Sequence, residues 1–485
     1  MVAENSITER TMGGLFWRFM ERCSAQGVTF IVSIVLARLL APTVYGTIAL
    51  VTVFTTIMQV FVDSGLANAL IQKKEVDDVD FSTVFYFNIV FSLILYIAMF
   101  LLAPFISNFY NMPSLTPVIR LLSSTILVSG IRNVQQAYVS RHLLFKKFFF
   151  ATIGGTIGAA VVGIGMAYMG YGVWALVGQQ VFNSLCGTII LWFVVEWRPK
   201  LKFSFQRLKT LFSFGWKLLV SQLIDTIYKD IRSLIIGKLY TETDLAFYNK
   251  GNEFPKVIVN NINKSIDSVL LPTMAKEQEN RERVKAMTSR AIRTSTYIMA
   301  PLMLGLAVCA EPLIKLLLTD KWLPCVFFMR IFCVTYMFYP IHTANLNAIN
   351  ALGRSDLFLK LEIAKKIVGV LALLSTMWIS VESMAYSLFV TTILSTIINA
   401  FPNKKLLNYS WFEQMKDILP HIGIAILMAI PVYLMQYLPL PTVVVLILQV
   451  ITGAVVYTGL SVLFKLEVFR YLFGIIQGFI KRRGK

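Results

Sequence analysis

Long apolar segments recur along this chain at intervals of roughly 30 to 40 residues and are separated by short connections. A helix needs about 20 mainly apolar residues to cross a lipid bilayer, so each segment is long enough to span one. The residues are 56% hydrophobic and only 15% charged, with a mean hydropathy of +0.68, well above that of a soluble globular protein. We therefore predict an all-α membrane protein with about fourteen transmembrane helices.

The predicted spans leave no room for a separate soluble domain. Residues 1–14 include Glu4 and Glu9 and lack a small-residue cleavage site, so we predict that they are not a secretory signal peptide. The first helix is therefore expected to remain in the mature protein. The spans are expected at 13–37, 43–70, 81–106, 115–139, 148–169, 173–195, 208–238, 245–272, 286–310, 323–350, 356–380, 383–402, 414–437 and 441–464.

The formal net charge of +19 would suggest a nucleic-acid partner in a soluble protein, but here its location decides its meaning. Basic residues concentrate in alternate connections, whereas the intervening turns at 107–117 and 437–441 hold almost none. Basic connections are retained in the cytoplasm, so we predict that both termini are cytoplasmic and that no nucleic acid binds. The basic connections lie near 73–74, 141–147, 198–209, 276–285, 354, 404–405 and in the tail 481–485.

A weak internal repeat relates the two halves of the chain. Residues 36–46, LARLLAPTVYG, align with residues 236–246, IGKLYTETDLA, at an offset of 200. With about six spans before the basic connection at 196–209, both halves start on the same side of the membrane, which predicts a parallel repeat with a cavity between two pseudo-symmetric lobes. The expected domains are 1–200 and 201–405 for the lobes, 406–464 for two added helices and 465–485 for a basic amphipathic tail.

Four predicted spans, at 13–37, 43–70, 208–238 and 245–272, carry polar residues on one face. A charge inside the membrane is costly and needs water, a partner or a ligand, so we expect these faces to line the cavity; mutual ion pairing is the alternative for any single residue. The cations and amides of this set are Arg18, Arg22, Gln59, Lys229, Arg232, Lys256, Asn260, Asn263 and Lys264. The acids are Glu21, Asp63, Asp225, Glu253 and Asp267.

Asp63 is the main candidate for ion coupling. The repeat offset of 200 matches it with an amide, Asn263, so only the first half has a titratable group at this position. Protonation of a buried carboxylate could link transport to the proton gradient, whereas a helix-end acid that only caps or pairs is the plainer interpretation. Lys365 and Lys366 lie inside another span and either snorkel to the cytoplasm or extend a binding groove. The five cysteines and three histidines lack metal-ligand spacing, so we predict no metal, no cofactor and no catalytic residue.

Several stretches, in their order and spacing, resemble polysaccharide flippases of the colanic acid and teichuronic acid exporter branch, within the multidrug/oligosaccharidyl-lipid/polysaccharide superfamily. The resemblance runs from about residue 12 to about residue 400, and it departs from the family in TDKW at 319–322, where Asp320 replaces an expected glycine. The stretches are LARLLAPTVYG at 36–46, LIQKKEVDDVDFSTVF at 70–85, GVWALV at 172–177, RPKLKFS at 198–204, FSFGWKLL at 212–219, YNKGNEFP at 248–255 and LLPTM at 270–274.

The resemblance implies an alternating-access carrier of the bacterial inner membrane that moves an undecaprenyl-diphosphate-linked oligosaccharide to the periplasmic leaflet. Its expected partners are this substrate, membrane lipids and the polysaccharide polymerase machinery. The cations would then bind the diphosphate, the amides would bind sugar, and the acids would couple an ion. Two alternatives are a small-solute or multidrug antiporter, which would need an acidic and aromatic cavity, and a membrane-embedded polymerase or glycosyltransferase, which would need acidic or histidine pairs on a sizeable loop.

Overall fold

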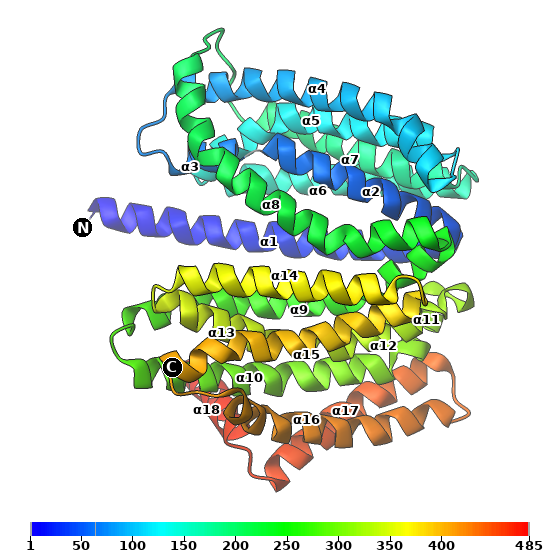
Figure 1. Ribbon diagram of the computed structural model, residues 1–485, viewed down its shortest axis with the longest axis vertical. Coiled ribbons are helices and arrows are strands. Elements are labelled where there is room, and N and C mark those ends of the chain that lie inside the picture. Colours follow the sequence, from blue (N-terminus) through cyan, green and yellow to red (C-terminus); the bar gives the residue numbers. More distant parts are fainter. Residues whose placement is uncertain (1, 64, 484–485) are drawn as a thin grey trace. The chain divides into compact units, whose positions relative to one another are not determined.

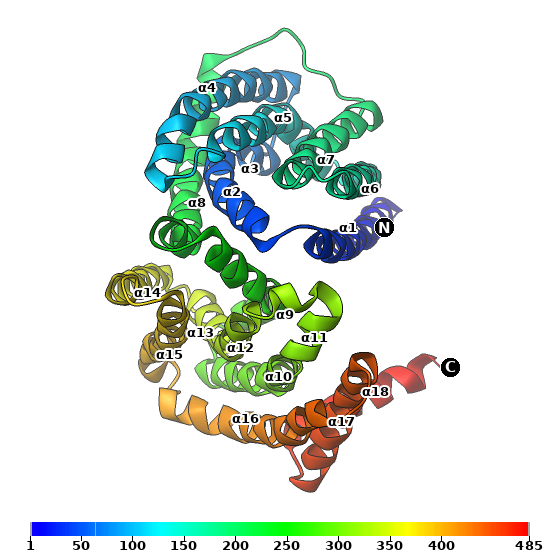
Figure 2. The ribbon, with the colours of Figure 1, turned by 90° about the vertical axis from the view of Figure 1, so that its right-hand side faces the viewer.

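The computed structural model describes residues 2–63 and 65–483, and these residues form helices and no strand (Figure 1). They divide into two compact units, with the boundary between Ala246 and Phe247 inside one long helix. In Figure 2 many helices of each unit are seen nearly end-on, so each unit is a bundle of roughly aligned helices. The predicted domain limits at 200, 405 and 464 stay predictions.

The first unit contains seven long helices and one short one, and it ends in the first turn of a further helix. A break at Gly65, whose φ of 67° suits glycine, divides the second predicted span into two helices. The helices are α1 (Val2–Leu39), α2 (Pro42–Asp63), α3 (Leu66–Gln72), α4 (Asp78–Tyr110), α5 (Leu115–Arg141), α6 (Phe145–Tyr168), α7 (Val173–Val194), α8 (Phe205–Leu239) and the start of α9 (Glu242–Lys276).

The second unit contains the rest of α9 and the remaining helices. The span predicted at 323–350 is broken near Met337 into two helices, and a short helix not predicted from the sequence precedes it. The elements are α10 (Arg281–Val308), α11 (Ala310–Leu318), η1 (Asp320–Trp322), α12 (Cys325–Tyr336), α13 (Tyr339–Ala351), α14 (Ser355–Thr376), α15 (Val381–Leu406), α16 (Trp411–Leu434), η2 (Met435–Tyr437), α17 (Thr442–Leu463) and α18 (Glu467–Arg483).

Eleven segments of the described chain are long and apolar enough to cross a membrane. The other three predicted spans correspond to α8, α9 and α14, which have 35, 35 and 22 residues and so are not too short. They fall outside the eleven, and each contains several charged residues; α8 alone carries Lys217, Asp225, Lys229, Asp230 and Arg232 in its middle. The multi-spanning all-helical class is confirmed, and the count of fourteen spans stays a prediction.

Ion pairs hold the connection between α3 and α4 against the start of α8 in the first unit. Asp80 is 1% exposed and lies 2.7 Å from the Lys73 ammonium and 3.5 Å from the Arg207 guanidinium. Arg207 also donates to Asp77, and this hydrogen bond holds the pKa of the Asp77 carboxyl below its usual value. Trp197 is buried beside them against Phe81. The acids of residues 76–80, VDDVD, therefore hold the start of α8 and the connection before it against the start of α4.

Buried amides join three helices in the core of the second unit. Asn345 on α13 exchanges hydrogen bonds of 2.8 and 3.0 Å with Gln414 on α16, and it accepts one of 2.6 Å from Asn403 on α15. All three side chains are fully buried. An amide in an apolar core is stable only when it is paired, so this network fixes which faces of the three helices meet.

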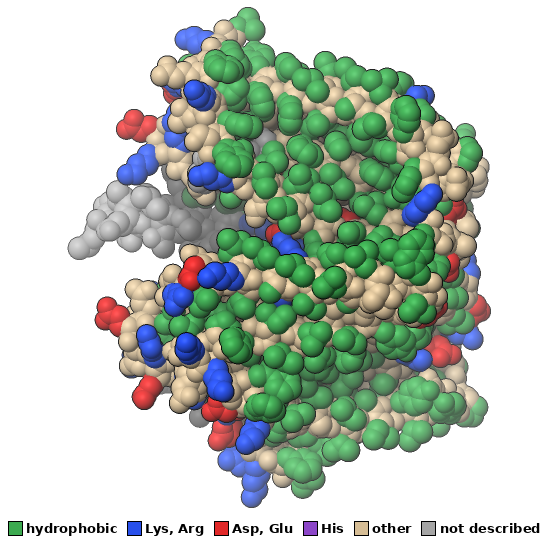
Figure 3. Space-filling model, in the orientation of Figure 1, with side chains coloured by type: hydrophobic (Ala, Val, Ile, Leu, Met, Phe, Trp, Pro, Cys, Tyr) green, Lys and Arg blue, Asp and Glu red, His purple; other side chains and the backbone are tan. Residues whose placement is uncertain are grey.

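Figure 3 shows that most of the visible surface along the helices is hydrophobic, as a lipid-facing surface requires. Lys and Arg side chains gather toward the end of the first unit where α3 meets α4, and toward the corresponding end of the second unit, where α9 meets α10. The basic connections of the sequence therefore collect at one end of each unit.

Candidate functional site

The helix α9 has the two faces that its sequence predicts. Phe254 and Val259 are 8% and 2% exposed and pack into the second unit, although Val269, expected on the same apolar side, is 67% exposed. The polar side is open over more than two turns. Its exposed predicted site residues are Lys256, Asn260, Lys264 and Asp267.

Arg232 on α8 is a buried cation with unused hydrogen-bond donors. Its side chain is 6% exposed, yet its Nε and Nη2 atoms have no hydrogen-bond partner among the described residues. Helix α8 packs closely on α2 near this point, since a Cβ added to Gly237 would lie 2.1 Å from the Leu50 side chain. Lys229, almost one turn earlier on α8, is exposed. The arrangement leaves a buried guanidinium able to take an anion.

Arg18 on α1 has partners within the first unit. Its Nη1 atom lies 3.3 Å from a carboxylate oxygen of Glu21, which is 7% exposed, and its guanidinium lies over the rings of Phe145 and Phe148 on α6. These contacts match the ion-pair alternative rather than an open site. Arg22, by contrast, is exposed.

Asp63 ends α2 and is held by two amides. Its Oδ1 atom accepts hydrogen bonds of 3.0 Å from Gln59 and 2.8 Å from Asn133 on α5. Arg132, next to Asn133, is a further half-buried cation whose Nε atom has no hydrogen-bond partner among the described residues. The site prediction missed Arg132 and Asn133, although an arginine inside an otherwise apolar span was a usable signal.

Glu253, another predicted acid, belongs to a local network. Glu253 on α9 pairs with Lys250 at 2.7 Å, and the Lys250 ammonium, only 4% exposed, lies 5.8 Å from the centre of the Trp322 ring. Asp225 on α8 is half-buried. Lys250 lies within the YNKGNEFP motif, but nothing in the local pattern distinguishes its buried environment from that of the exposed Lys256.

Lys365 on α14 also has a partner. Lys365 forms an ion pair of 2.5 Å with Glu362 and its side chain is 15% exposed, so it neither reaches the helix end nor lines an open groove.

His342 on α13 contacts Asn399 at 2.9 Å. Within the described part of the chain, no three His, Cys, Asp or Glu side chains come close enough to hold a metal ion.

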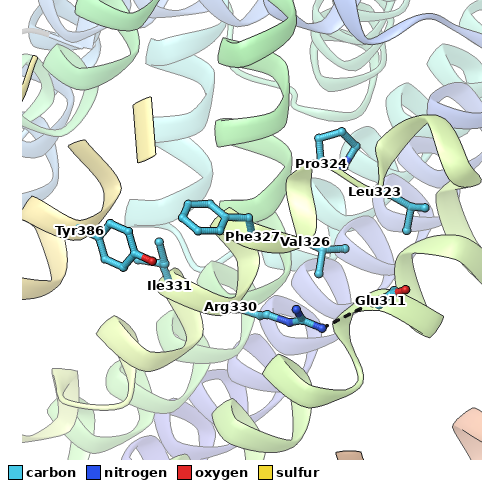
Figure 4. Close-up of a pocket in the computed structure, with 8 residues that line it drawn as sticks. All are labelled: Glu311, Leu323, Pro324, Val326, Phe327, Arg330, Ile331 and Tyr386. Carbon is cyan, nitrogen blue, oxygen red and sulfur yellow. Dashed lines mark ion pairs between the residues drawn. The ribbon is translucent and has the colours of Figure 1, made fainter. Parts of the chain in front are cut away.

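A cavity of about 540 Å³ lies in the second unit between α11, α12 and α15 (Figure 4). Arg330 and Glu311 form an ion pair of 3.7 Å on one side of it, and the rings of Phe327 and Tyr386 lie on the other. None of the residues predicted from sequence lines this cavity. Its remaining walls are Leu323, Pro324, Val326 and Ile331.

The profile of the family described as polysaccharide biosynthesis proteins matches residues 35–327, more than half of the chain. The chain belongs to this family. It is 24% identical to the lipopolysaccharide biosynthesis protein WzxC of Escherichia coli over 91% of this chain and 87% of WzxC. It is also 24% identical to the succinoglycan biosynthesis transport protein ExoT of Rhizobium meliloti, over 63% of this chain and 62% of ExoT.

The fold agrees with this membership. The lipid II flippase MurJ in an inward closed conformation superposes with a TM-score of 0.74 at 14% identity, covering 95% of this chain and all of MurJ. An inward-facing multidrug resistance transporter of the MATE family superposes with a TM-score of 0.60 at 13% identity, covering 79% of this chain and 94% of that transporter. The expected membership of a polysaccharide biosynthesis family is confirmed by the family profile, and the two solved structures share the fold of this chain.

Proposed function

We propose that the protein is a flippase that carries an undecaprenyl-diphosphate-linked oligosaccharide across the bacterial inner membrane by alternating access. The observation that carries the proposal is the buried Arg232 with two unpartnered nitrogens. A guanidinium out of water without a partner is strongly destabilising, so a protein retains one where a ligand completes it. Adjacent N–H groups of arginine match two oxygens of a phosphate, which makes a diphosphate the fitting ligand.

The open face of α9 supplies what the rest of such a substrate needs. Lys256 and Lys264 are exposed cations, and Asn260 lies between them on the same face. Cations attract the diphosphate, while amides both donate to and accept from sugar hydroxyls. We propose that this face lines the substrate cavity.

The membrane topology in this proposal follows from the basic connections, which we assign to the cytoplasm together with both termini. Lys202, an exposed residue of the connection 195–204, gives the test. In a variant without native cysteines, Lys202→Cys is expected to react with an impermeant thiol reagent only after the membrane is opened. Reaction in intact cells would reverse the topology.

The alternatives fit less well. An antiporter for organic cations would need an acidic face. The exposed charged residues of α9 are instead three lysines and one aspartate, and Arg232 on α8 is a buried cation. A membrane-embedded glycosyltransferase would need a loop to carry its acids, and the longest connection between described helices is 195–204.

A deletion strain tests the function. It is expected to lose surface polysaccharide while lipid-linked oligosaccharide accumulates on the cytoplasmic leaflet. Arg232→Gln should fail to restore export although the protein is inserted, whereas Lys315→Gln, which neutralises an exposed cation on α11, should restore it. Normal polysaccharide in the deletion strain, with no accumulated intermediate, would refute the proposal.

A further inference from the structure

Both halves of the chain carry the same short pattern near the end of their second long helix. Residues 59–66 read QVFVDSGL and residues 263–270 read NKSIDSVL, so an amide precedes an aspartate by four positions and Asp-Ser-x-Leu follows in both. The offset here is 204 rather than 200. This pattern pairs Asp267 with Asp63, one helical turn beyond Asn263, which the offset of 200 between the helix starts pairs with it.

The tertiary contact of the two aspartates is also the same. Asp63 accepts a hydrogen bond of 2.8 Å from Asn133 on α5, and Asp267 accepts one of 2.7 Å from Asn347 on α13. The two asparagines are 5% and 6% exposed, whereas both aspartates are exposed. In each unit a buried amide thus holds an open carboxylate; we call each such group of aspartate, preceding amide and asparagine a clasp.

The helices that supply the asparagines are equivalent as well. The pattern Arg-x-x-Leu-Phe-x-Lys follows both helices: at 141–147 it begins at the last residue of α5, and at 354–360 it begins three residues after the end of α13. Two similar contacts between equivalent helices are hard to ascribe to chance packing, because the connections that follow α5 and α13 also have the same length of three residues. The repeat points to a shared role for the clasps.

Each clasp leaves hydrogen-bond acceptors unused. Only the Oδ1 atoms of Asp63 and Asp267 accept hydrogen bonds from the described residues, so the Oδ2 atoms stay open. In the second clasp the Oδ1 atom of Asn263 is buried without a hydrogen-bond partner. The free groups of both clasps are acceptors that carry negative charge or a carbonyl dipole, so they fit a neutral ligand rich in donors. In the first clasp the Arg132 guanidinium also interacts electrostatically with Asp63.

The position of the clasps along the helices supports the same ligand. At 1.5 Å per residue, Asp63 lies about 31 Å from the start of α2 and Asp267 about 37 Å from the start of α9. Both therefore lie near the end of their unit where the basic connections collect, which the proposed topology makes the cytoplasmic end. A lipid-linked glycan entering from the cytoplasm meets these groups first.

We infer that the two clasps are equivalent binding sites for hydroxyl groups of the transported glycan, one in each half of the protein. This inference rests on the proposed function. It assigns the glycan to the acceptor groups of the clasps and the diphosphate to the cations. Sugar hydroxyls donate charge-assisted hydrogen bonds to the open carboxylate oxygens, while the buried asparagine fixes the orientation of each carboxylate. The diphosphate binds the cations.

The test compares two lipids on the purified full-length chain in detergent: undecaprenyl diphosphate bearing one neutral hexose, and undecaprenyl diphosphate without sugar. The wild type is expected to bind the hexose-bearing lipid more tightly. Asp63→Asn and Asp267→Asn should each reduce that preference by about tenfold, because a neutral amide is a weaker acceptor, while the affinity for the bare lipid stays unchanged. Asp320→Asn, the same change at an exposed turn, is the control and should alter neither affinity.

The outcomes separate the possible errors. An unchanged sugar preference in both Asn variants, or equal binding of the two lipids by the wild type, overturns the clasp assignment but leaves the flippase intact. Loss of binding to both lipids in equal measure makes the clasps structural and also overturns it. A wild type that binds neither lipid overturns the proposed function itself. If Asp63→Asn does not fold, Asp267→Asn carries the same test in the other unit.

Ion coupling, the role considered for Asp63 from sequence, makes the opposite prediction for the same variant. Under coupling, Asp63→Asn keeps its full sugar preference and loses only the dependence of export on the pH gradient. That pair of results would overturn the glycan assignment. A lost preference with an unchanged response to the pH gradient would support it.

Discussion

Replacing Arg232 by methionine should stabilise the protein and abolish its function at the same time. Met is of similar length and apolar, so Arg232→Met removes a charge that is 6% exposed and whose Nε and Nη2 atoms lack hydrogen-bond partners among the described residues. Exchanging buried charges for apolar side chains of similar volume raises the free energy of unfolding by about 1–4 kcal/mol, and an unpaired charge belongs at the upper end.

The loss in substrate binding follows from the same two atoms. Each charge-assisted hydrogen bond contributes about 1.5–3 kcal/mol, so the loss of two corresponds to a decrease of at least about a hundredfold in affinity for the lipid diphosphate. The two effects have opposite signs. A purely structural arginine would give a loss of stability instead.

Thermal unfolding in detergent without substrate, together with binding of undecaprenyl diphosphate, measures both effects. Lys250→Met is the matched control, because Lys250 is equally buried at 4% exposed but pairs with Glu253 at 2.7 Å. Its removal breaks the ion pair with Glu253, whose side chain is 38% exposed, and should lower the free energy of unfolding by up to about 1 kcal/mol. A lower unfolding temperature for Arg232→Met than for the wild type would show that a protein group already satisfies Arg232 and would refute the reasoning.

Three further predictions concern the fold. Gly46→Ala would place a Cβ 1.9 Å from a backbone carbonyl and should cost about 1–3 kcal/mol or more, whereas Gly165→Ala meets nothing within 4 Å and should add about 0.5–1 kcal/mol; equal unfolding temperatures would contradict this. Asp80→Asn removes the charge of a side chain that is 1% exposed and leaves Lys73 without its carboxylate, whereas Arg207 keeps its bond to Asp77. It should destabilise the first unit by about 1–3 kcal/mol, and a denaturation midpoint equal to that of the wild type would contradict this. The hydrogen bond from Arg207 lowers the pKa of Asp77, so its stabilisation is present above the ordinary value of 3.8 and is lost below it. Arg207→Gln should raise that pKa toward 3.8 in a carbon-13 NMR titration, and an unmoved midpoint would argue against the pair.

The interior of the second unit shows why some polar residues were not assigned from the sequence. Asn345, Gln414 and Asn403 lie in three different predicted spans, and each alone looks like an isolated amide in an apolar helix. They meet only because α13, α16 and α15 pack together with these faces inward. Contacts between residues about 60 or 70 positions apart depend on helix rotation and depth, which hydropathy does not encode.

The sequence by itself determined the membrane class, the helical segments, the polar face of α9 and the family, because these depend on local composition and period. Tertiary structure alone decided which polar residues are engaged. It paired Arg18 with Glu21, left Arg232 buried with free donors, and brought Asn133 to Asp63. The cost of an intramembrane charge is fixed by its neighbours in space, and those come from helices far apart in the chain.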